Sequence, residues 1–381
     1  MTAVEIAGVG IHPFGRFPDR IVTDMGVAAV RAALADAGID HTDRPGFQAA
    51  FCGTAYSGVA AGHKVLGALA RTGIPIVDVE AGCASGGAAL GLAAGAIRAG
   101  QYDTVLVFGM EKMPKGIIRS SFFEPWREES GLAATPAYFA LRAQRLMRER
   151  GITKDDLARV VVKNRAHGAH NPDAMYQSPT TAETVLGSRL VCEPLHLHML
   201  CSPNEGAAAV VLRRAAADAT GFVRLDAAVL RSHLPGSVLG EATPLAGIDD
   251  TDITPPSTLA ADAAYAEAGI GPDDVDVAEV QDTDAARELL GWEELGLCAP
   301  GDQAQILADG DATMGGRRPV NPSGGLLSKG EPLGASALGQ VVELTRQLRG
   351  DAGPRQVHGA RVALAHTVGR GANASVTILS R

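Results

Sequence analysis

The sequence has few aromatic residues and no long hydrophobic run. Phe, Trp and Tyr make up 4% of the 381 residues, whereas apolar residues as a group reach 46% and glycine occurs 46 times. A core of small side chains allows helices and strands to approach closely. No stretch has eighteen consecutive apolar residues, which argues against a membrane span. The start MTAVEIAGVGIHPFG carries Glu5 and lacks a long apolar run, so we expect no signal peptide.

The sequence also has fewer basic than acidic residues, and its number of cysteines is not even. The chain has 34 Lys and Arg against 43 Asp and Glu, a net charge of −9. This balance argues against nucleic acid or an anionic membrane as partner, so any anionic ligand needs a local basic group. The five cysteines are odd in number and widely spread, which favours a reducing cytoplasm over a disulfide framework. They are Cys52, Cys83, Cys192, Cys201 and Cys298.

Apolar runs of strand length alternate with helical patterns along the whole chain, and the second half repeats the order of elements of the first. We therefore expect a layered α/β fold with an N-terminal half over 1–220 and a C-terminal half over 221–381. Residues 81–101 form a helical segment so poor in polar side chains that it should be buried on nearly all sides. Residues 114–190 carry charges, turn formers and two helical patterns, which indicate an insertion over one end of the sheet.

Cys83 lies between an apolar strand segment and the small-residue helix. A thiol at such a turn sits at a helix N-terminus, where free amides and the helix dipole favour the reactive thiolate. Ser85, Gly86 and Gly87 follow and leave room for a substrate beside the backbone. The alternative is a small buried residue in a tight turn, because free cysteine is often part of the core. Spacing alone leaves both interpretations open.

Seven motifs in order along nearly the whole chain carry a family resemblance. They are IAGVGIHPFGR, VDVEAGCASGGAALGLAAGAIRAGQYDTVLVFGMEKM, YFALRAQRLMRERG, VVVKNRAHGAHNPDAMY, LCSPNEGAAAVVL, NPSGGLLSKGEPLGAS and HTVGRGANASVTILSR. Together they resemble the thiolase superfamily, and most closely its sterol-carrier-protein or lipid-transfer branch. The resemblance implies a duplicated α/β/α/β/α fold and an acyl-enzyme formed on Cys83. It also implies acyl-CoA as substrate, coenzyme A as substrate or product, no further cofactor and no metal.

The chain departs from the family pattern at the residue expected to activate the nucleophile. Relatives that perform thiolysis or Claisen condensation usually read GHP where this chain reads Gly330-Glu331-Pro332. An ionised carboxylate repels a developing oxyanion and a thiolate, so Glu331 cannot simply replace imidazole. It remains a candidate general base, or a neutral donor if burial raises its pKa.

A second departure follows the strand segment VDVAEV. Members of the lipid-transfer branch, which this chain resembles, typically have a His-Asp-Cys-Phe-like run at this place. This chain instead has Gln281, Asp282, Thr283 and Asp284. The carboxyl end of a strand is where α/β sites tend to lie, so Asp282 is a candidate catalytic residue. The alternative is that Asp282 and Asp284 cap the helix that follows, since Asp is a favoured N-cap.

The C-terminal motif supplies the remaining site candidates. Gly369 matches the loop whose amide helps to hold the thioester oxygen, and Ser85 and Gly86 are expected to line the same substrate site. Many thiolases carry an acid/base cysteine close to this loop, and none is present here, so His366 is the nearby candidate for proton transfer. The alternative for His366 is a structural strand-end histidine.

Three functions follow from these features. The first is an acyltransferase that uses Cys83 to make or break a C–C bond in a β-oxoacyl-CoA-type substrate. The second is a CoA-ester retro-aldolase, in which Glu331, Asp282 and His366 act without a covalent intermediate, as similar proteins of steroid side-chain removal do. The third is a non-catalytic subunit that binds a CoA thioester. The acyl group is not readable from the sequence.

The resemblance also suggests partners, while two other patterns point to weaker sites. Related proteins are usually dimers, and several pair with a small zinc-ribbon and OB-fold protein. Cys192, His196, His198 and Cys201 resemble a zinc ligand set, but their spacing matches no common zinc motif and we expect none. The glycines of GVGIHPFG resemble a dinucleotide loop only weakly, so a strand end and turn is preferred.

Overall fold

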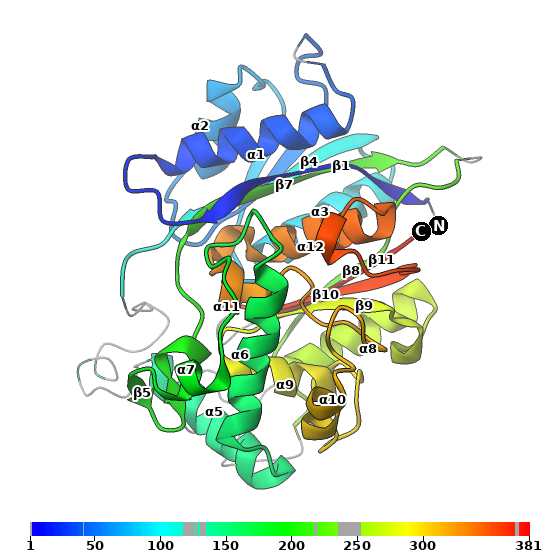
Figure 1. Cartoon of the computed structure of the whole chain (residues 1–381). Helices are drawn as coiled ribbons and strands as arrows, with labels where there is room; N and C mark the ends of the chain where they lie inside the picture. Colours follow the sequence, from blue (N-terminus) through cyan, green and yellow to red (C-terminus); the bar gives the residue numbers. More distant parts are fainter. Residues whose placement is uncertain are drawn as a thin grey trace.

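The computed structural model describes residues 2–40, 42–116, 126, 129, 135–216, 219–234, 253–369 and 373–381. Part of the predicted insertion and part of the predicted junction at 216–221 lie outside these residues. The described elements form layers in which two helices lie between two parts of a sheet and further helices cover the outside (Figure 1). This arrangement confirms the layered α/β prediction.

The N-terminal half contributes one part of the sheet. In the order β3-β2-β4-β7-β1, β2 runs parallel to β3 and β4, whereas β7 runs antiparallel to β4 and β1. Helix α1 (Val22–Asp36) covers its outer face through small apolar contacts with β1 and β7, and α2 (Ala61–Ala68) lies beside α1. The strands are β1 (Val4–Gly15), β2 (Ala49–Gly53), β3 (Ile76–Val79), β4 (Thr104–Lys112) and β7 (Glu205–Arg214).

The C-terminal half repeats this topology. From the junction outward its order is β8-β11-β10-β9, with β11 antiparallel to β8 and β10, and β10 parallel to β9. From the junction outward, each half therefore begins with its first strand and continues with its last, penultimate and second strands; in the N-terminal half β3 follows at the outer edge. A single Glu5–Arg224 pairing joins the halves into one nine-stranded sheet. The strands are β8 (Arg224–Ser232), β9 (Val277–Val280), β10 (Val362–Gly369) and β11 (Asn373–Ser380).

The two central helices occupy equivalent places in the duplicated halves. Helices α3 (Ser85–Arg98) and α12 (Leu333–Arg349) contact each other and strands of both halves. Glycine allows this spacing, because a Cβ on Gly109 of β4 would clash with the carbonyl oxygen of Gly334 on α12. The prediction for α3 was wrong in its last turns: residues 85–90 are buried, but Leu92 is 53% exposed.

The remaining helices surround the C-terminal half. Of the predicted insertion, the helices over 138–151 and 153–169 are confirmed as α5 (Thr135–Arg150) and α6 (Lys154–Gly168). Helix α6 begins at a capping box of Thr153 and Asp156 and contacts α9 and α11. The other elements are α7 (Ala182–Leu186), β5 (Leu190–Cys192), β6 (Leu195–His196), η1 (Leu197–Met199), α8 (Pro256–Ala268), η3 (Pro272–Asp274), α9 (Ala285–Glu294), α10 (Gln303–Asp309), α11 (Gly325–Lys329) and η4 (Gly353–Arg355).

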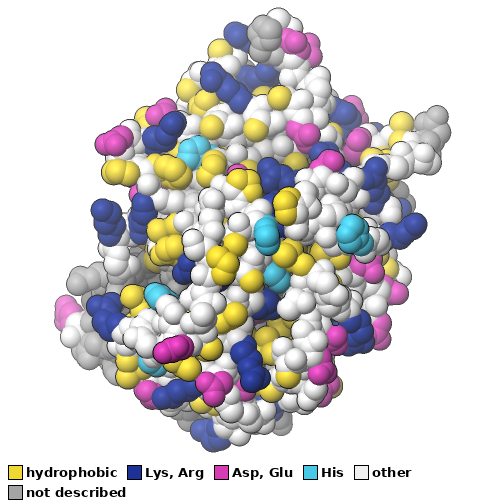
Figure 2. Space-filling view, in the orientation of Figure 1, with side chains coloured by type: hydrophobic (Ala, Val, Ile, Leu, Met, Phe, Trp, Pro, Cys, Tyr) yellow, Lys and Arg dark blue, Asp and Glu magenta, His cyan; other side chains and the backbone are white. Residues whose placement is uncertain are grey.

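Two properties of the surface agree with the composition. Among the described residues, no helix combines the length and the apolarity that crossing a bilayer requires. On the face drawn in Figure 2, basic and acidic side chains are interspersed around the molecule. That face therefore lacks the continuous basic stripe that nucleic-acid binding requires.

Candidate active site

Cys83 lies in a tight turn directly before α3. The turn is closed by backbone hydrogen bonds from Ala84 N to Ala81 O (3.2 Å) and from Ser85 N to Gly82 O (3.1 Å). The Ser85 hydroxyl accepts from Ala81 N (2.9 Å) and donates to Gly82 O (2.6 Å), so this side chain fixes the turn from inside. Cys83 is 5% exposed and packs against Met113 and Leu333. The thiol thus sits at the positive end of a buried helix.

Gly86 and Gly369 allow other backbone segments to approach this turn. A Cβ on Gly86 would lie 2.9 Å from Leu338 Cγ on α12, so Gly86 serves close helix packing. A Cβ on Gly369 would clash with the carbonyl oxygen of Ala81, which places the end of β10 directly against the turn that holds Cys83. Ser85 and Gly86 are therefore occupied in positioning the turn, while Gly369 lies beside it.

Glu331 lies between α11 and α12, close to the residues that surround Cys83. Its side chain is buried and accepts hydrogen bonds from Gln281 Nε2 at Oε1 (3.1 Å) and from Cys201 Sγ at Oε2 (3.4 Å). Gln281 in turn accepts from the amide of Val368 (2.5 Å), the residue before Gly369. A continuous set of contacts thus leads from Glu331 through Gln281 to the Cys83 turn.

Cys201 is a site residue that the sequence interpretation missed. Its amide donates to Thr283 O (2.9 Å), and burial, followed by the charge and hydrogen bond of Glu331, raises the pKa of its thiol well above 9.0. The charge of Cys83 contributes to the same shift, so the two sulfurs lie within electrostatic range. The available sequence signal is its place in LCSPNEG, just before β7: this motif is part of the family resemblance, whereas Cys201 itself was considered only within the weak zinc pattern.

The residues of the weak zinc pattern form other contacts. His196 Nδ1 lies 2.7 Å from Ser188 O, and Cys201 contacts Glu331. No three His, Cys, Asp or Glu side chains of the described chain are grouped so as to hold a metal ion.

His366 lies on the wrong face of β10 for the proton transfer predicted for it. The next residue, Thr367, donates to Gln340 Oε1 on the central helix α12 (2.9 Å). Because neighbouring side chains of a strand point to opposite faces, His366 points to the outer layer, where Nε2 lies 3.1 Å from Ser257 Oγ of α8. Burial, together with the charge of Arg287, lowers the pKa of His366 well below 6.5. This geometry fits a neutral structural histidine.

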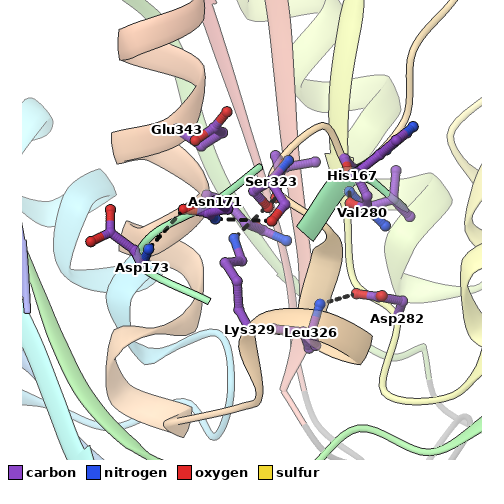
Figure 3. Close-up of polar contacts among 12 residues, drawn as sticks. His167, Asn171, Asp173, Val280, Asp282, Ser323, Leu326, Lys329 and Glu343 are labelled. Carbon is purple, nitrogen blue, oxygen red and sulfur yellow. Dashed lines mark hydrogen bonds and ion pairs between the residues drawn. The ribbon is translucent and has the colours of Figure 1, made fainter. Parts of the chain in front are cut away.

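Asp282 is buried and forms its hydrogen bonds with α11 and α6. It accepts from the amides of Leu326 (2.6 Å) and Leu327 (3.1 Å) in the first turn of α11, and from Asn164 Nδ2 (2.8 Å) (Figure 3). Burial and then the charge of Glu288 raise the pKa of Asp282. The capping alternative was thus right in kind but named the wrong helix for Asp282.

Asp284 is the residue that caps α9. Its carboxylate accepts from Arg287 N (3.0 Å) and forms an ion pair with Arg142 of α5. Of the residues proposed for proton handling, the structure therefore brings Glu331 close to Cys83 and places Asp282 and His366 in other contacts.

Buried ion pairs join α11 to β9 and the insertion helix α6 to α9. Lys329 Nζ lies 3.2 Å from Glu279 Oε2, and Lys163 Nζ lies 2.8 Å from Glu288 Oε1. Glu279 also accepts from the amide and hydroxyl of Ser323; Figure 3 shows Ser323 and Lys329. Breaking one partner of such a pair leaves an uncompensated buried charge, so these contacts fix the position of the Glu331 turn.

The pKa of His167 predicts a loss of stability in acid. Burial and then the charge of Lys163 lower this pKa from 6.5 to about 3, while Nδ1 lies 2.9 Å from Asn321 O. Below pH 6.5 the unfolded chain takes up a proton that the folded protein does not, so stability present above that pH is lost as pH falls toward 3. We expect wild type to lose up to about 1.4 kcal/mol per pH unit relative to His167→Gln.

Urea unfolding at several pH values between about 5 and 7 measures this difference. The exposed His358 provides a matched control, because His358→Gln should leave the pH dependence of wild type unchanged. Parallel curves for wild type and His167→Gln would contradict the assignment of a neutral buried imidazole.

Comparisons with known protein families and sequences agree on one family. The sequence model "Thiolase, N-terminal domain" matches residues 4–191, and "Thiolase C-terminal domain-like" matches residues 245–381. The benzoylsuccinyl-CoA thiolase subunit BbsB of Thauera aromatica is 36% identical over 98% of this chain and 96% of its own length. Sterol carrier protein 2 of Gallus gallus is 35% identical over 98% of this chain and 71% of its own length. Acetyl-CoA acetyltransferase of Methanothermobacter thermautotrophicus is 35% identical over both full lengths.

A solved structure extends the likeness to three dimensions. The Ltp2-ChsH2(DUF35) aldolase is 28% identical, with a TM-score of 0.85 over 99% of this chain and 97% of the solved one. The family matches, the duplicated strand order and the central small-residue helix preceded by Cys83 agree with one another. The chain therefore belongs to the thiolase family, with relatives on its sterol-carrier-protein branch, and is an enzyme of the acyltransferase type.

Proposed function

We propose that this enzyme forms an acyl-enzyme on Cys83 and makes or breaks a C–C bond in a β-oxoacyl-CoA-type substrate. The observation that carries the proposal is the position of Cys83 at the N-terminus of α3, with Gly369 against its turn. Helix dipole and free amides lower the cost of a thiolate there. The Gly369 amide, together with that of Cys83, is proposed to hold the thioester oxygen.

The proposed reaction in the cleavage direction has two half-reactions. The Cys83 thiolate attacks the β-carbonyl carbon, the C2–C3 bond breaks, and its electron pair goes to C2 of the departing acyl-CoA, which takes up a proton. Coenzyme A then loses its thiol proton, attacks the Cys83 thioester, and releases the longer or shorter acyl-CoA with the Cys83 thiolate restored. Coenzyme A is thus substrate and product, and the proposal requires no further cofactor.

Trapping the intermediate tests this proposal. Wild-type protein incubated with acetyl-CoA or benzoyl-CoA and quenched in acid should gain the mass of one acyl group on the peptide that contains Cys83. Hydroxylamine should remove that mass, because it cleaves thioesters. Turnover of an acyl-CoA with no adduct on Cys83 at any quench time would sink the covalent route.

A retro-aldol cleavage without a covalent intermediate is the second candidate. Two observations favour it: Glu331 stands in the place of the family histidine, and the solved relative with a TM-score of 0.85 is titled an aldolase. In this reaction Glu331 takes the proton of the β-hydroxyl, the C2–C3 bond breaks to leave a carbonyl product, and the acyl-CoA enolate takes that proton back from Glu331 at C2. Substrates would then be β-hydroxyacyl-CoA esters, and Cys83 would form no bond to them.

We further propose that the enzyme acts as a dimer in the cytoplasm. Strand β3 lies at the end of the sheet, where its 42% exposed Val77 and the 53% exposed Leu92 of the neighbouring α3 present apolar surface. An edge strand with such surface suits pairing with a second copy. A small zinc-ribbon and OB-fold protein is proposed as an additional partner, since one relative is named a thiolase subunit and another is titled with a DUF35 protein.

A further inference from the structure

Two acidic groups meet beside the nucleophile at a place where the family pattern lacks its usual proton-handling residues. We propose that Cys201 and Glu331 form the proton-transfer pair of this enzyme, with Cys201 as the group that gives a proton to C2 of the departing acyl-CoA. The contact that carries the inference is Cys201 Sγ to Glu331 Oε2, at 3.4 Å. The inference rests on the acyl-transfer function proposed above.

Backbone contacts fix both members of the pair. The amide of Cys201 donates to Thr283 O (2.9 Å), and the amide of Glu331 donates to Ser202 O (2.9 Å), next to Cys201 in the chain. Asn204 Nδ2 donates to Lys329 O (2.7 Å) at the end of α11, which holds the entry to the Glu331 turn. These hydrogen bonds therefore fix the segment that carries the thiol relative to the segment that carries the carboxylate.

The surroundings keep the proton on sulfur in the resting enzyme. Glu331 accepts from the thiol on one oxygen and from Gln281 on the other, an arrangement that suits a carboxylate as acceptor of both hydrogen bonds. Burial, and after it the neighbouring carboxylate, raises the pKa of Cys201, so it remains a thiol at neutral pH. Cys201 is half-buried, whereas Cys83 is nearly enclosed.

The proton balance closes over one cycle. After Cys83 takes the acyl group, the C2 carbanion accepts the proton of Cys201 and leaves as acyl-CoA, which generates the Cys201 thiolate beside Glu331. That thiolate then accepts the thiol proton of incoming coenzyme A, and the coenzyme A thiolate attacks the acyl-Cys83 thioester. Cys83 leaves as a thiolate and Cys201 is again a thiol, so no oxidant, metal or additional base enters the cycle.

Exchange of C2 hydrogens separates this role from acylation. With acetyl-CoA as probe in D2O, the acetylated wild-type enzyme should incorporate deuterium at C2, since the same thiolate removes the proton in the reverse direction. Cys201→Ala should lower the exchange rate by about 100-fold or more, the usual contribution of a general acid or base. It should still gain an acetyl mass on Cys83, because a coenzyme A thiolate leaves without help. Cys201→Ser, with a far weaker acid, should resemble Cys201→Ala.

A second measurement tests the contact without any substrate. Glu331→Gln removes the carboxylate that raises the pKa of Cys201, so iodoacetamide should alkylate Cys201 faster in this variant than in wild type at mildly alkaline pH. Peptide mass spectrometry reads the rate at each cysteine. Cys298→Ala is the matched control, because Cys298 is another half-buried thiol, and it should change neither the exchange rate nor Cys201 alkylation.

The outcomes distinguish this inference from the function on which it rests. Acetylation of Cys83 with unchanged C2 exchange in Cys201→Ala overturns the inference alone, as do equal alkylation rates in wild type and Glu331→Gln. C2 exchange that depends on Cys201 without any acyl adduct on Cys83 keeps the proton-transfer pair and rejects the acyl-enzyme. A wild type that shows neither reaction overturns both.

Discussion

Cys83→Ala is expected to abolish acyl transfer, with a fall in kcat on the order of 10⁴-fold or more, as seen when a covalent nucleophile is removed. In the proposed reaction the sulfur of Cys83 is the atom that bonds to the acyl group. Stability should change little, because alanine keeps the Cβ and the turn is closed by Ser85 and backbone hydrogen bonds. A spectrophotometric assay of free coenzyme A thiol, with thermal unfolding in parallel, measures both quantities.

Cys192→Ala provides the matched control for this variant. Cys192 lies on β5, away from the α3 turn, and its replacement should leave turnover within about twofold, since surface-side substitutions usually have small effects. Activity retained in Cys83→Ala, combined with loss of activity in Glu331→Gln, is the result that would replace acyl transfer by the retro-aldol reaction.

Gly369→Ala should cause the second largest loss, about 100-fold in kcat, although the added group is one methyl. Its Cβ would clash with the carbonyl oxygen of Ala81, a backbone atom of the turn that carries Cys83. The methyl therefore displaces either the turn or the end of β10, and misplaced reacting groups lose rate steeply. The loss should appear in kcat and in the rate of Cys83 acylation by acetyl-CoA.

Gly95→Ala separates this effect from a general response to alanine. Gly95 lies on an exposed part of α3, and its added Cβ would meet no atom within 4 Å, so the helix should gain up to about 1 kcal/mol of stability with unchanged activity. If Gly369→Ala acylates at the wild-type rate, the close approach of β10 to the nucleophile turn has no role in catalysis.

The strands and helices follow from local patterns, because period, length and turn residues decide them. The apolar runs before Cys83 and before Gln281 predicted β3 and β9, and the small residues after Cys83 predicted the central helix α3. The duplicated order of strands was also readable, since each half repeats the same sequence of elements. Cys83, the proposed nucleophile, was singled out by the motif that contains it.

The rest of the site depends on register and on contacts between distant segments, which local patterns do not carry. The face to which His366 points is set by the pairing of β10 with its neighbours, and a shift of one residue would have turned it toward α12. Asp282 caps a helix that begins more than forty residues later, so proximity in sequence favoured the wrong helix. Cys201 meets Glu331 across 130 positions, and only the folded chain reveals that contact.

The two reactive positions stand in the same relation to the two central helices. Cys83 precedes the first residue of α3 by two positions, and Glu331 precedes the first residue of α12 by two positions, one in each copy of the duplicated unit. Each side chain accordingly lies near the N-terminus of its own helix, where the partial positive charge favours an anionic form. The ancestral symmetry has been kept in the packing and abandoned in the side chains, so that one copy supplies the bond-forming atom and the other supplies the carboxylate. If both residues act as proposed, neither copy contains a complete active site, and the catalytic unit is the docked pair.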